Sequence, residues 1–226
     1  MYTAFHQAHL DGSPVLHPLW FKYPKDENTF TLQYQFFYGN SILVSPVTGD
    51  NATSVSIYLP QDIFYEFDTL SPVQGTGSFI TLNDVPFTKI PLHIKGGAVL
   101  PLRARSAMTT TALRTNGFEF IVAPNTQGEA SGTLYVDDGE SITPASSTSV
   151  NLQFKNGKLE VQGDFGYPTG VSVSNVRFLG VNSQPNRVLV DGEDVYGSGY
   201  SYHSSTKVLD VTIGVPFIKN LSVQYL

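Results

Sequence analysis

From Ser41 to the C-terminus, apolar and polar residues alternate along short segments that are bounded by turn-forming residues. The alternation is clearest over residues 54–59 and 209–213. A period of two places successive side chains on opposite faces of a strand. The dipeptides Asn156-Gly157 and Asp191-Gly192 lie between such segments, and both suit the positive φ angles of a two-residue hairpin turn. Short strands with frequent turns predict antiparallel sheets that pack as sandwiches.

Composition supports this prediction and excludes several classes of protein. Only 14% of the 226 residues are charged, against roughly 25% in an average soluble domain, which leaves few residues for the wet faces of long amphipathic helices. The net charge of -6 is not interrupted by a basic run, so we expect no nucleic-acid partner. No apolar stretch approaches the ~20 residues of a membrane helix, so we expect no membrane contact. The absence of cysteine excludes disulfides and thiolate metal sites.

Motifs that hold cofactors or metals are missing as well. No G-x-G-x-x-G or P-loop string occurs, so we expect no nucleotide cofactor. His6 and His9 are three residues apart, but no acid or third histidine follows at metal-ligand spacing. We interpret Gly197-Ser198-Gly199 as a turn, because no G-x-S-x-G nucleophile motif is present. We therefore expect neither a cofactor nor a metal.

The first 36 residues have a different pattern from the rest. Residues 2–9 are expected to form a helix that ends at Asp11-Gly12, since glycine can adopt the left-handed conformation that stops helices. Residues 14–23 are expected to form a strand that is apolar on both faces, as in a parallel barrel. Residues 26–36 are expected to form a short capped helix or an irregular connection. One helix and one strand are too little for a layer, so we expect a larger protein to supply the rest.

Six segments, in this order, resemble glycoside hydrolase family 31 α-glucosidases of the eukaryotic, fungal, secreted type. Each segment alone is weakly specific, and the ordered set covers most of the chain. They are Tyr2–His9 with Gly12, Pro18–Asp26, Gln35–Val47, Tyr58–Pro60, Ile90–Pro101 and Gly132–Ser141.

The resemblance implies a mainly β fold with two antiparallel β-sandwich domains, preceded by the last helix and strand of a (β/α)8 barrel that a partner chain completes. Residues 1–36 would be the C-terminal end of the catalytic barrel. Residues 37–107 would be the proximal sandwich and residues 108–226 the distal one. Residues 106–117 have the weakest pattern in the sequence and are, from that pattern alone, a candidate linker. Because the barrel piece would expose apolar side chains, we expect that removing residues 1–36 leaves the sandwiches folded.

The resemblance also implies an activity that this chain does not perform alone. The family hydrolyses terminal α-linked glucose with retention, as in maltose and malto-oligosaccharides, in some members with transglucosylation. Its nucleophile lies in a Trp-x-Asp-Met-Asn-Glu-like motif, whereas the only tryptophan here, Trp20, is followed by Phe21-Lys22-Tyr23. We therefore expect no catalytic residue in this chain and both carboxylates on an N-terminal chain that binds the α-glucoside with it. His17 stands where many relatives have arginine, so the role of a guanidinium cannot be assumed there.

Two other classes of function remain open from the residues alone. The first is a free-standing carbohydrate-binding β-sandwich, which the fold allows but which has no need of residues 1–36. The second is a structural fragment without a ligand. The aromatic residues that would stack on sugars in the first case are also typical of a sandwich core; they are Tyr58, Phe64, Tyr65 and Phe67.

Asp137-Asp138-Gly139-Glu140 is the densest acidic cluster. Neighbouring strand residues point to opposite faces, so Asp137 and Asp138 are poorly placed as the paired carboxylates that a retaining glycosidase needs. The spacing also lacks the alternating acids of a calcium loop. We interpret the cluster as a strand and turn.

Two N-glycosylation sequons are present, Asn51-Ala52-Thr53 and Asn220-Leu221-Ser222. The first lies in a polar turn, and the second lies at the start of a terminal strand. Together with the resemblance they favour a secreted glycoprotein with glycans on Asn51 and Asn220.

Overall fold

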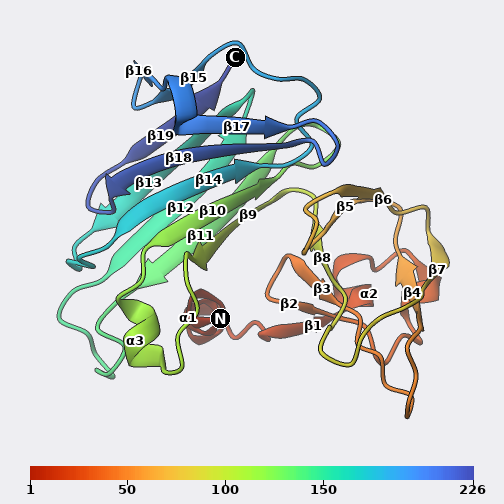
Figure 1. Ribbon diagram of the computed structural model, residues 1–226. Coiled ribbons are helices and arrows are strands. Elements are labelled where there is room, and N and C mark those ends of the chain that lie inside the picture. The colour runs from red at the N-terminus through yellow and green to blue at the C-terminus, as the bar shows by residue number, and fades with distance from the viewer. The chain divides into compact units, whose positions relative to one another are not determined.

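The computed structural model describes residues 1–226, and the chain divides into two compact units. The first unit comprises residues 1 and 3–96, and the second comprises residue 2 and residues 97–226. Figure 1 shows that strands dominate both units. The predicted mainly β fold with large antiparallel sheets is confirmed. None of the helices is long and apolar enough to cross a membrane.

The first unit is built on a six-stranded antiparallel sheet in the order β1-β2-β3-β8-β5-β6, together with a β4–β7 pair. Its buried core joins residues from both sheets and from α2, including Leu19, Phe37, Ile57 and Phe64. Its elements are α1 (Tyr2–Asp11, of which Tyr2 belongs to the second unit), β1 (Leu16–Pro18), α2 (Leu19–Lys22), η1 (Glu27–Thr29), β2 (Phe36–Tyr38), β3 (Ile42–Val44), β4 (Val55–Leu59), β5 (Ile63–Glu66), β6 (Pro72–Gln74), β7 (Ser78–Leu82) and β8 (Leu92–Lys95).

The second unit is an eleven-stranded sheet in the order β16-β15-β19-β13-β12-β11-β9-β10-β14-β18-β17. Its elements are β9 (Ala98–Arg103), α3 (Thr110–Arg114), β10 (Phe118–Ala123), β11 (Ala130–Val136), β12 (Thr148–Lys155), β13 (Lys158–Phe165), β14 (Ser172–Phe178), β15 (Val188–Val190), β16 (Glu193–Asp194), η2 (Gly197–Gly199), β17 (Tyr200–His203), β18 (Val208–Pro216) and β19 (Leu221–Tyr225).

This sheet folds over on itself to form a sandwich. β12 and β14 are separated by three strands in the sheet order, yet the rings of Phe154 and Phe178 lie 5.5 Å apart. β11 and β9 are joined by one bridged pair only, Ser131 with Ala98. Next to that bridge a Cβ on Gly132 would lie 2.1 Å from the carbonyl oxygen of Val99, so only glycine allows this close approach.

Local turn chemistry explains the elements that the sequence predicted. α1 ends at Gly12 with φ 74°, as expected. Asn156 and Gly157 both have positive φ between β12 and β13, and Asp191 and Gly192 do the same between β15 and β16. These two hairpins are confirmed.

The expected strand over residues 14–23 is wrong in extent and in partner. Only β1 is extended, and it pairs antiparallel with β2. At Pro18 the chain turns into the helical turn α2, which a proline at the start of a helix permits because it lacks an N–H that would need a partner. The turn buries Leu19 completely and leaves Trp20 and Phe21 about half exposed.

Residues 14–36 also contribute buried side chains to the first unit. Leu19 packs in the buried cluster. Gln35 is 7% exposed and hydrogen-bonds the backbone of Tyr58 on β4. The hydroxyl of Tyr58 donates to Asp26 at 2.7 Å. From this packing we expect that the sheet of the first unit depends on residues 14–36, in contrast to the expectation from the sequence.

The division between the compact units falls at residues 96–97. β9 lies in the second unit because it pairs along its whole length with β10. The domain boundaries expected after residues 36 and 107 stay predictions. The expected linker at residues 106–117 contains α3, whose first turn is capped by the side chain of Thr109 accepting from the N–H of Ala112.

Candidate functional site

The exposed aromatic cluster of α2 is the most distinctive surface of the first unit. It consists of Trp20 and Phe21, 45% and 48% exposed, and the buried His17. The ring centroids of Trp20 and Phe21 lie 5.8 Å apart, and those of His17 and Phe21 lie 5.0 Å apart. Large aromatic side chains that stay exposed together are typical of surfaces that another protein covers.

His17 lies on β1, and its side chain hydrogen-bonds the backbone of Pro14. The imidazole Nε2–H donates to the carbonyl oxygen of Pro14. Nδ1 is buried and has no hydrogen-bond partner in this chain. The side chain therefore has one unpartnered ring nitrogen beside the aromatic cluster.

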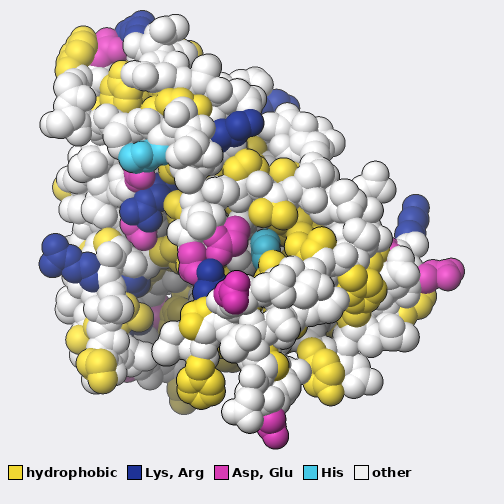
Figure 2. All heavy atoms as spheres, turned by 45° about the vertical axis from the view of Figure 1, so that its right-hand side comes forward, with side chains coloured by type: hydrophobic (Ala, Val, Ile, Leu, Met, Phe, Trp, Pro, Cys, Tyr) yellow, Lys and Arg dark blue, Asp and Glu magenta, His cyan; other side chains and the backbone are white.

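More exposed apolar residues belong to the same stretch of chain. They lie on α1, at the start of β1 and in the connection to β2, and they are Phe5, Leu10, Leu16, Phe30 and Tyr34. On the face that Figure 2 shows, acidic and basic side chains adjoin one another instead of forming separate fields. Residues 1–36 thus expose several large apolar side chains besides those of the aromatic cluster.

The acidic cluster in the second unit is a closed turn. The buried Asp137 accepts from the hydroxyl of Tyr2 at 2.6 Å and from the N–H of Gly139 at 2.8 Å. Asp138 accepts from the hydroxyl and N–H of Ser141 and from the N–H of Glu140, and these hydrogen bonds lower the pKa of Asp138 to about 2. The carboxylates are occupied by the turn itself, which supports the interpretation as a strand and turn.

The structure separates the other sequence candidates. Tyr58, Phe64 and Tyr65 are at most 4% exposed, so their rings cannot stack on a sugar, and Phe67 is half-buried. His9 is exposed on α1. These residues are part of the core or of an exposed helix surface and do not form a binding platform, so the rival interpretation as a free-standing sugar-binding module loses its proposed residues.

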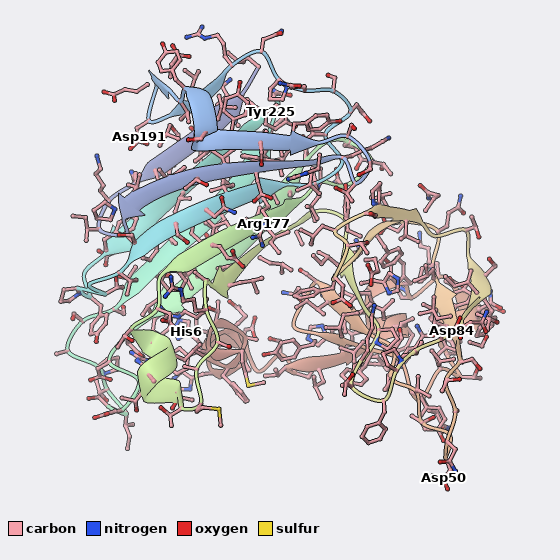
Figure 3. All side chains as sticks on the ribbon, in the orientation of Figure 1. His6, Asp50, Asp84, Arg177, Asp191 and Tyr225 are labelled. Carbon is pink, nitrogen blue, oxygen red and sulfur yellow. The ribbon has the colours of Figure 1, made fainter.

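The two sequons lie at the surface. Asn51 is exposed with φ 55°, and Figure 3 shows its neighbour Asp50 at the outer tip of the loop between β3 and β4. Asn220 is exposed just before β19, and its Oδ1 accepts from the N–H of Gly163 at 3.3 Å. Both are accessible, but Asn220 is held by a hydrogen bond and Asn51 projects from a loop tip.

The sequence analysis did not single out His93, a buried titratable residue on β8. It is 3% exposed, and its Nδ1 has no partner. Burial lowers the pKa of His93; the nearby Glu66 opposes this shift and Lys89 reinforces it. His93 pairs with Leu43 on β3 and with Glu66 on β5. This pairing joins distant parts of the chain, so no local sequence pattern predicts it.

We expect the stability of the first unit to fall as the pH drops below about 6.5, the pKa of an unperturbed histidine. The unfolded chain binds the His93 proton before the folded chain does, so stability is complete above that pH and is lost as the pH falls through the lowered pKa. Urea unfolding between about pH 5 and 7.5 measures this, above the range in which carboxylates titrate.

The matched variants are His93→Gln, which should flatten the pH dependence, and His9→Gln on the exposed surface of α1, which should keep it. An unchanged pH slope in His93→Gln would assign the dependence to another group.

Comparison with solved structures shows the class of protein to which this fold belongs. The second unit and the sheets of the first have the fold of the C-terminal domains of large glycosidases. The crystal structure of a glucosidase II alpha subunit matches 100% of this chain with a TM-score of 0.85 and 25% identity, over 27% of its own length. A Flavobacterium johnsoniae family 31 dextranase shares the fold over 99% of this chain, with a TM-score of 0.77 and 24% identity, over 30% of its own length.

The sequence comparisons agree. Residues 12–100 match the glycosyl hydrolase family 31 C-terminal domain. A probable alpha/beta-glucosidase of Aspergillus fumigatus is 48% identical over 187 residues, which are 83% of this chain and 21% of the relative. An uncharacterized family 31 glucosidase of Schizosaccharomyces pombe is 30% identical over 99% of this chain and 23% of its own length. The chain belongs to glycoside hydrolase family 31 and spans between a fifth and a quarter of the length of these relatives.

Proposed function

We propose that this chain is the C-terminal part of an α-glucosidase that releases glucose from the non-reducing ends of α-glucosides such as maltose. The observation that carries the proposal is the 48% identity over 187 residues to a probable alpha/beta-glucosidase. The reaction would be a double displacement with retention, in which one carboxylate attacks the sugar and a second acts first as acid and then as base. Transglucosylation would follow where a sugar replaces water as the acceptor.

The role of this chain would be to complete and brace the catalytic part. The compact acidic turn at Asp137 and Asp138 is fully hydrogen-bonded, and no nucleophile motif is present. Both catalytic carboxylates would lie in the N-terminal remainder. That remainder would cover the aromatic cluster His17, Trp20 and Phe21, which is exposed here.

Hydrolysis of a chromogenic α-glucoside tests the proposal. The complete enzyme should release the chromophore, and this chain alone should not, because neither carboxylate belongs to it. The anomeric form of the first glucose released, followed by NMR, should be α. Turnover by the isolated chain, or a β product from the complete enzyme, would contradict the proposal.

We also propose that the protein is secreted and carries N-glycans. Asn51 should be modified in native material, because it lies at an exposed loop tip next to the residue labelled Asp50. Asn220 should be modified less completely, since its side chain bonds Gly163 and adjoins a paired strand. Peptide mass mapping with and without a glycan-removing enzyme measures both occupancies. An unmodified Asn51 in material from the native fungal source would count against secretion.

A further inference from the structure

The loop between β7 and β8, residues 83–91, exposes two apolar side chains at its tip. Phe87 is completely exposed, at 105%, and Ile90 is 58% exposed. Moving a phenylalanine side chain out of water is favourable, because it removes a large apolar surface from contact with the solvent. Phe87 is therefore available to an apolar surface outside this chain.

The loop is held firmly, so its exposed side chains are presented in a defined position. The N–H of Val85 donates to the carbonyl oxygen of Thr53 at 2.9 Å, and the side chain of Val85 is buried. The N–H of Lys89 donates to the carbonyl oxygen of Pro86 at 2.9 Å, which closes a turn with Phe87 in its second position.

The lysine side chain supplies a third anchor. Lys89 Nζ lies 3.1 Å from Glu66 Oε1 and 2.7 Å from Asp68 Oδ2. Glu66 itself accepts from the N–H of Thr69 at 2.8 Å. These ion pairs hold the charged side chain of Lys89 against residues 66–68.

The sheet register places another exposed ring at the same end of the first unit. Leu92 at the start of β8 pairs with Val44, and Val44 pairs with Phe36 at the start of β2. Ile90 and Tyr34 each lie two residues before these paired positions, at one end of the sheet. Tyr34 is 65% exposed. Aromatic and aliphatic side chains with a charged rim are the composition of a protein–protein contact.

We propose that Phe87 and Ile90 insert into an apolar pocket of the N-terminal remainder of the same enzyme, as a second contact besides the aromatic cluster of α2. This inference rests on the proposed function, which supplies that remainder. The matched relative extends over nearly five times the aligned length, so most of its surface lies outside this chain. A second copy is the weaker candidate, because each copy carries a net charge of -6 and like charges repel.

The first test is hydroxyl-radical labelling of Phe87 in the complete enzyme and in this chain alone. We expect at least fivefold slower labelling of Phe87 in the complete enzyme and an unchanged rate for Ile142, which is 102% exposed in a loop of the second unit. Equal labelling of Phe87 in both would overturn the proposal. Labelling that slows as this chain alone is concentrated would also overturn it and would identify a second copy as the occupant.

The second test supplies this chain and the N-terminal remainder as separate chains and measures their dissociation constant. Phe87→Asp should weaken assembly at least tenfold, Phe87→Leu should restore most of it, and Ile142→Asp should change it less than twofold. Phe87 is fully exposed in this chain, so none of these variants removes a core contact. Assembly of Phe87→Asp with wild-type affinity would overturn the proposal.

Glucose release from maltose, measured on the same preparations, separates the two proposals. Protection of Phe87 without glucose release would leave the contact standing and reject the α-glucosidase assignment. Glucose release without protection of Phe87 would support the α-glucosidase assignment and reject the contact.

Discussion

Replacing Gln35 by leucine is expected to lower the free energy of unfolding of the first unit by at least about 3 kcal/mol. The side chain of Gln35 acts in place of a missing strand beside β4: its Oε1 accepts from the N–H of Tyr58 at 2.7 Å, and its Nε2 donates to the carbonyl oxygen of Tyr58 at 3.2 Å. Nε2 also donates to the hydroxyl of Ser45 at 2.9 Å. Leucine would leave these buried groups without partners, and each such group costs ~1–3 kcal/mol.

Chemical denaturation measures this loss, with Gln33→Leu as the matched control. Gln33 is two residues earlier and exposed, so its replacement should change stability by less than about 0.5 kcal/mol. Hydrogen exchange gives a local readout, because the N–H of Tyr58 should lose its protection in Gln35→Leu. A stability loss below about 1 kcal/mol would mean that water or a relaxed backbone replaces the amide.

Deleting residues 1–36 is expected to unfold the first unit and leave the sheet of the second unit folded. The deletion removes β1, the fully buried Leu19 and the Gln35 amide, and it takes the Asp26 carboxylate from the hydroxyl of Tyr58. Truncating a buried leucine to alanine alone costs about 2–5 kcal/mol. Together with the loss of Gln35 this approaches the whole stability of a typical domain, about 5–15 kcal/mol.

A shorter deletion is the control. Removing residues 1–13 deletes α1, which has no buried residue, and keeps β1, α2 and Gln35. Limited proteolysis with mass spectrometry should show residues 37–96 digested after the long deletion and protected after the short one, with residues 97–226 resistant in both. Resistance of residues 37–96 after the long deletion would show that residues 14–36 are detachable.

The sequence predicted those elements whose geometry is set locally. Gly12 ends α1, and the Asn156-Gly157 turn joins β12 to β13, because positive φ angles select glycine and asparagine within a few residues of chain. The strand that alternating residues predict over 209–213 is part of β18. A resemblance to family 31 gave the order of the segments, and the comparisons confirmed the family.

The sequence predictions that were wrong concern elements whose structure depends on tertiary contacts. An apolar run such as residues 14–23 fits a buried strand or a buried helical turn equally well, and periodicity cannot decide between them. In the folded protein the chain forms the helical turn α2 directly after Pro18, and this turn buries Leu19. The N-cap of α3 was visible in principle, since Thr109 has the side chain that such a position favours, but its short helix has little periodicity.

The candidate site was predicted less well than the fold. Tyr58, Phe64 and Tyr65, singled out as sugar platforms, are buried, whereas Trp20, Phe21 and Phe87 are among the exposed rings. Exposure depends on which side of a turn faces the sheet, and a single sequence does not contain that information. Gln35 and Tyr58 are 23 residues apart in the chain, so their pairing leaves no local pattern.

Whether this chain acts as the C-terminal part of a larger glycosidase is tested most directly by the native mass of the species that carries it in the source organism. Size-exclusion chromatography with light scattering, followed by peptide mass mapping of the fraction that hydrolyses maltose, gives this value. We predict that peptides of this chain occur in the active fraction, at a mass several times its own 24.7 kDa. Recovery of the chain only as a free species of 24.7 kDa, apart from all α-glucosidase activity, would contradict the assignment.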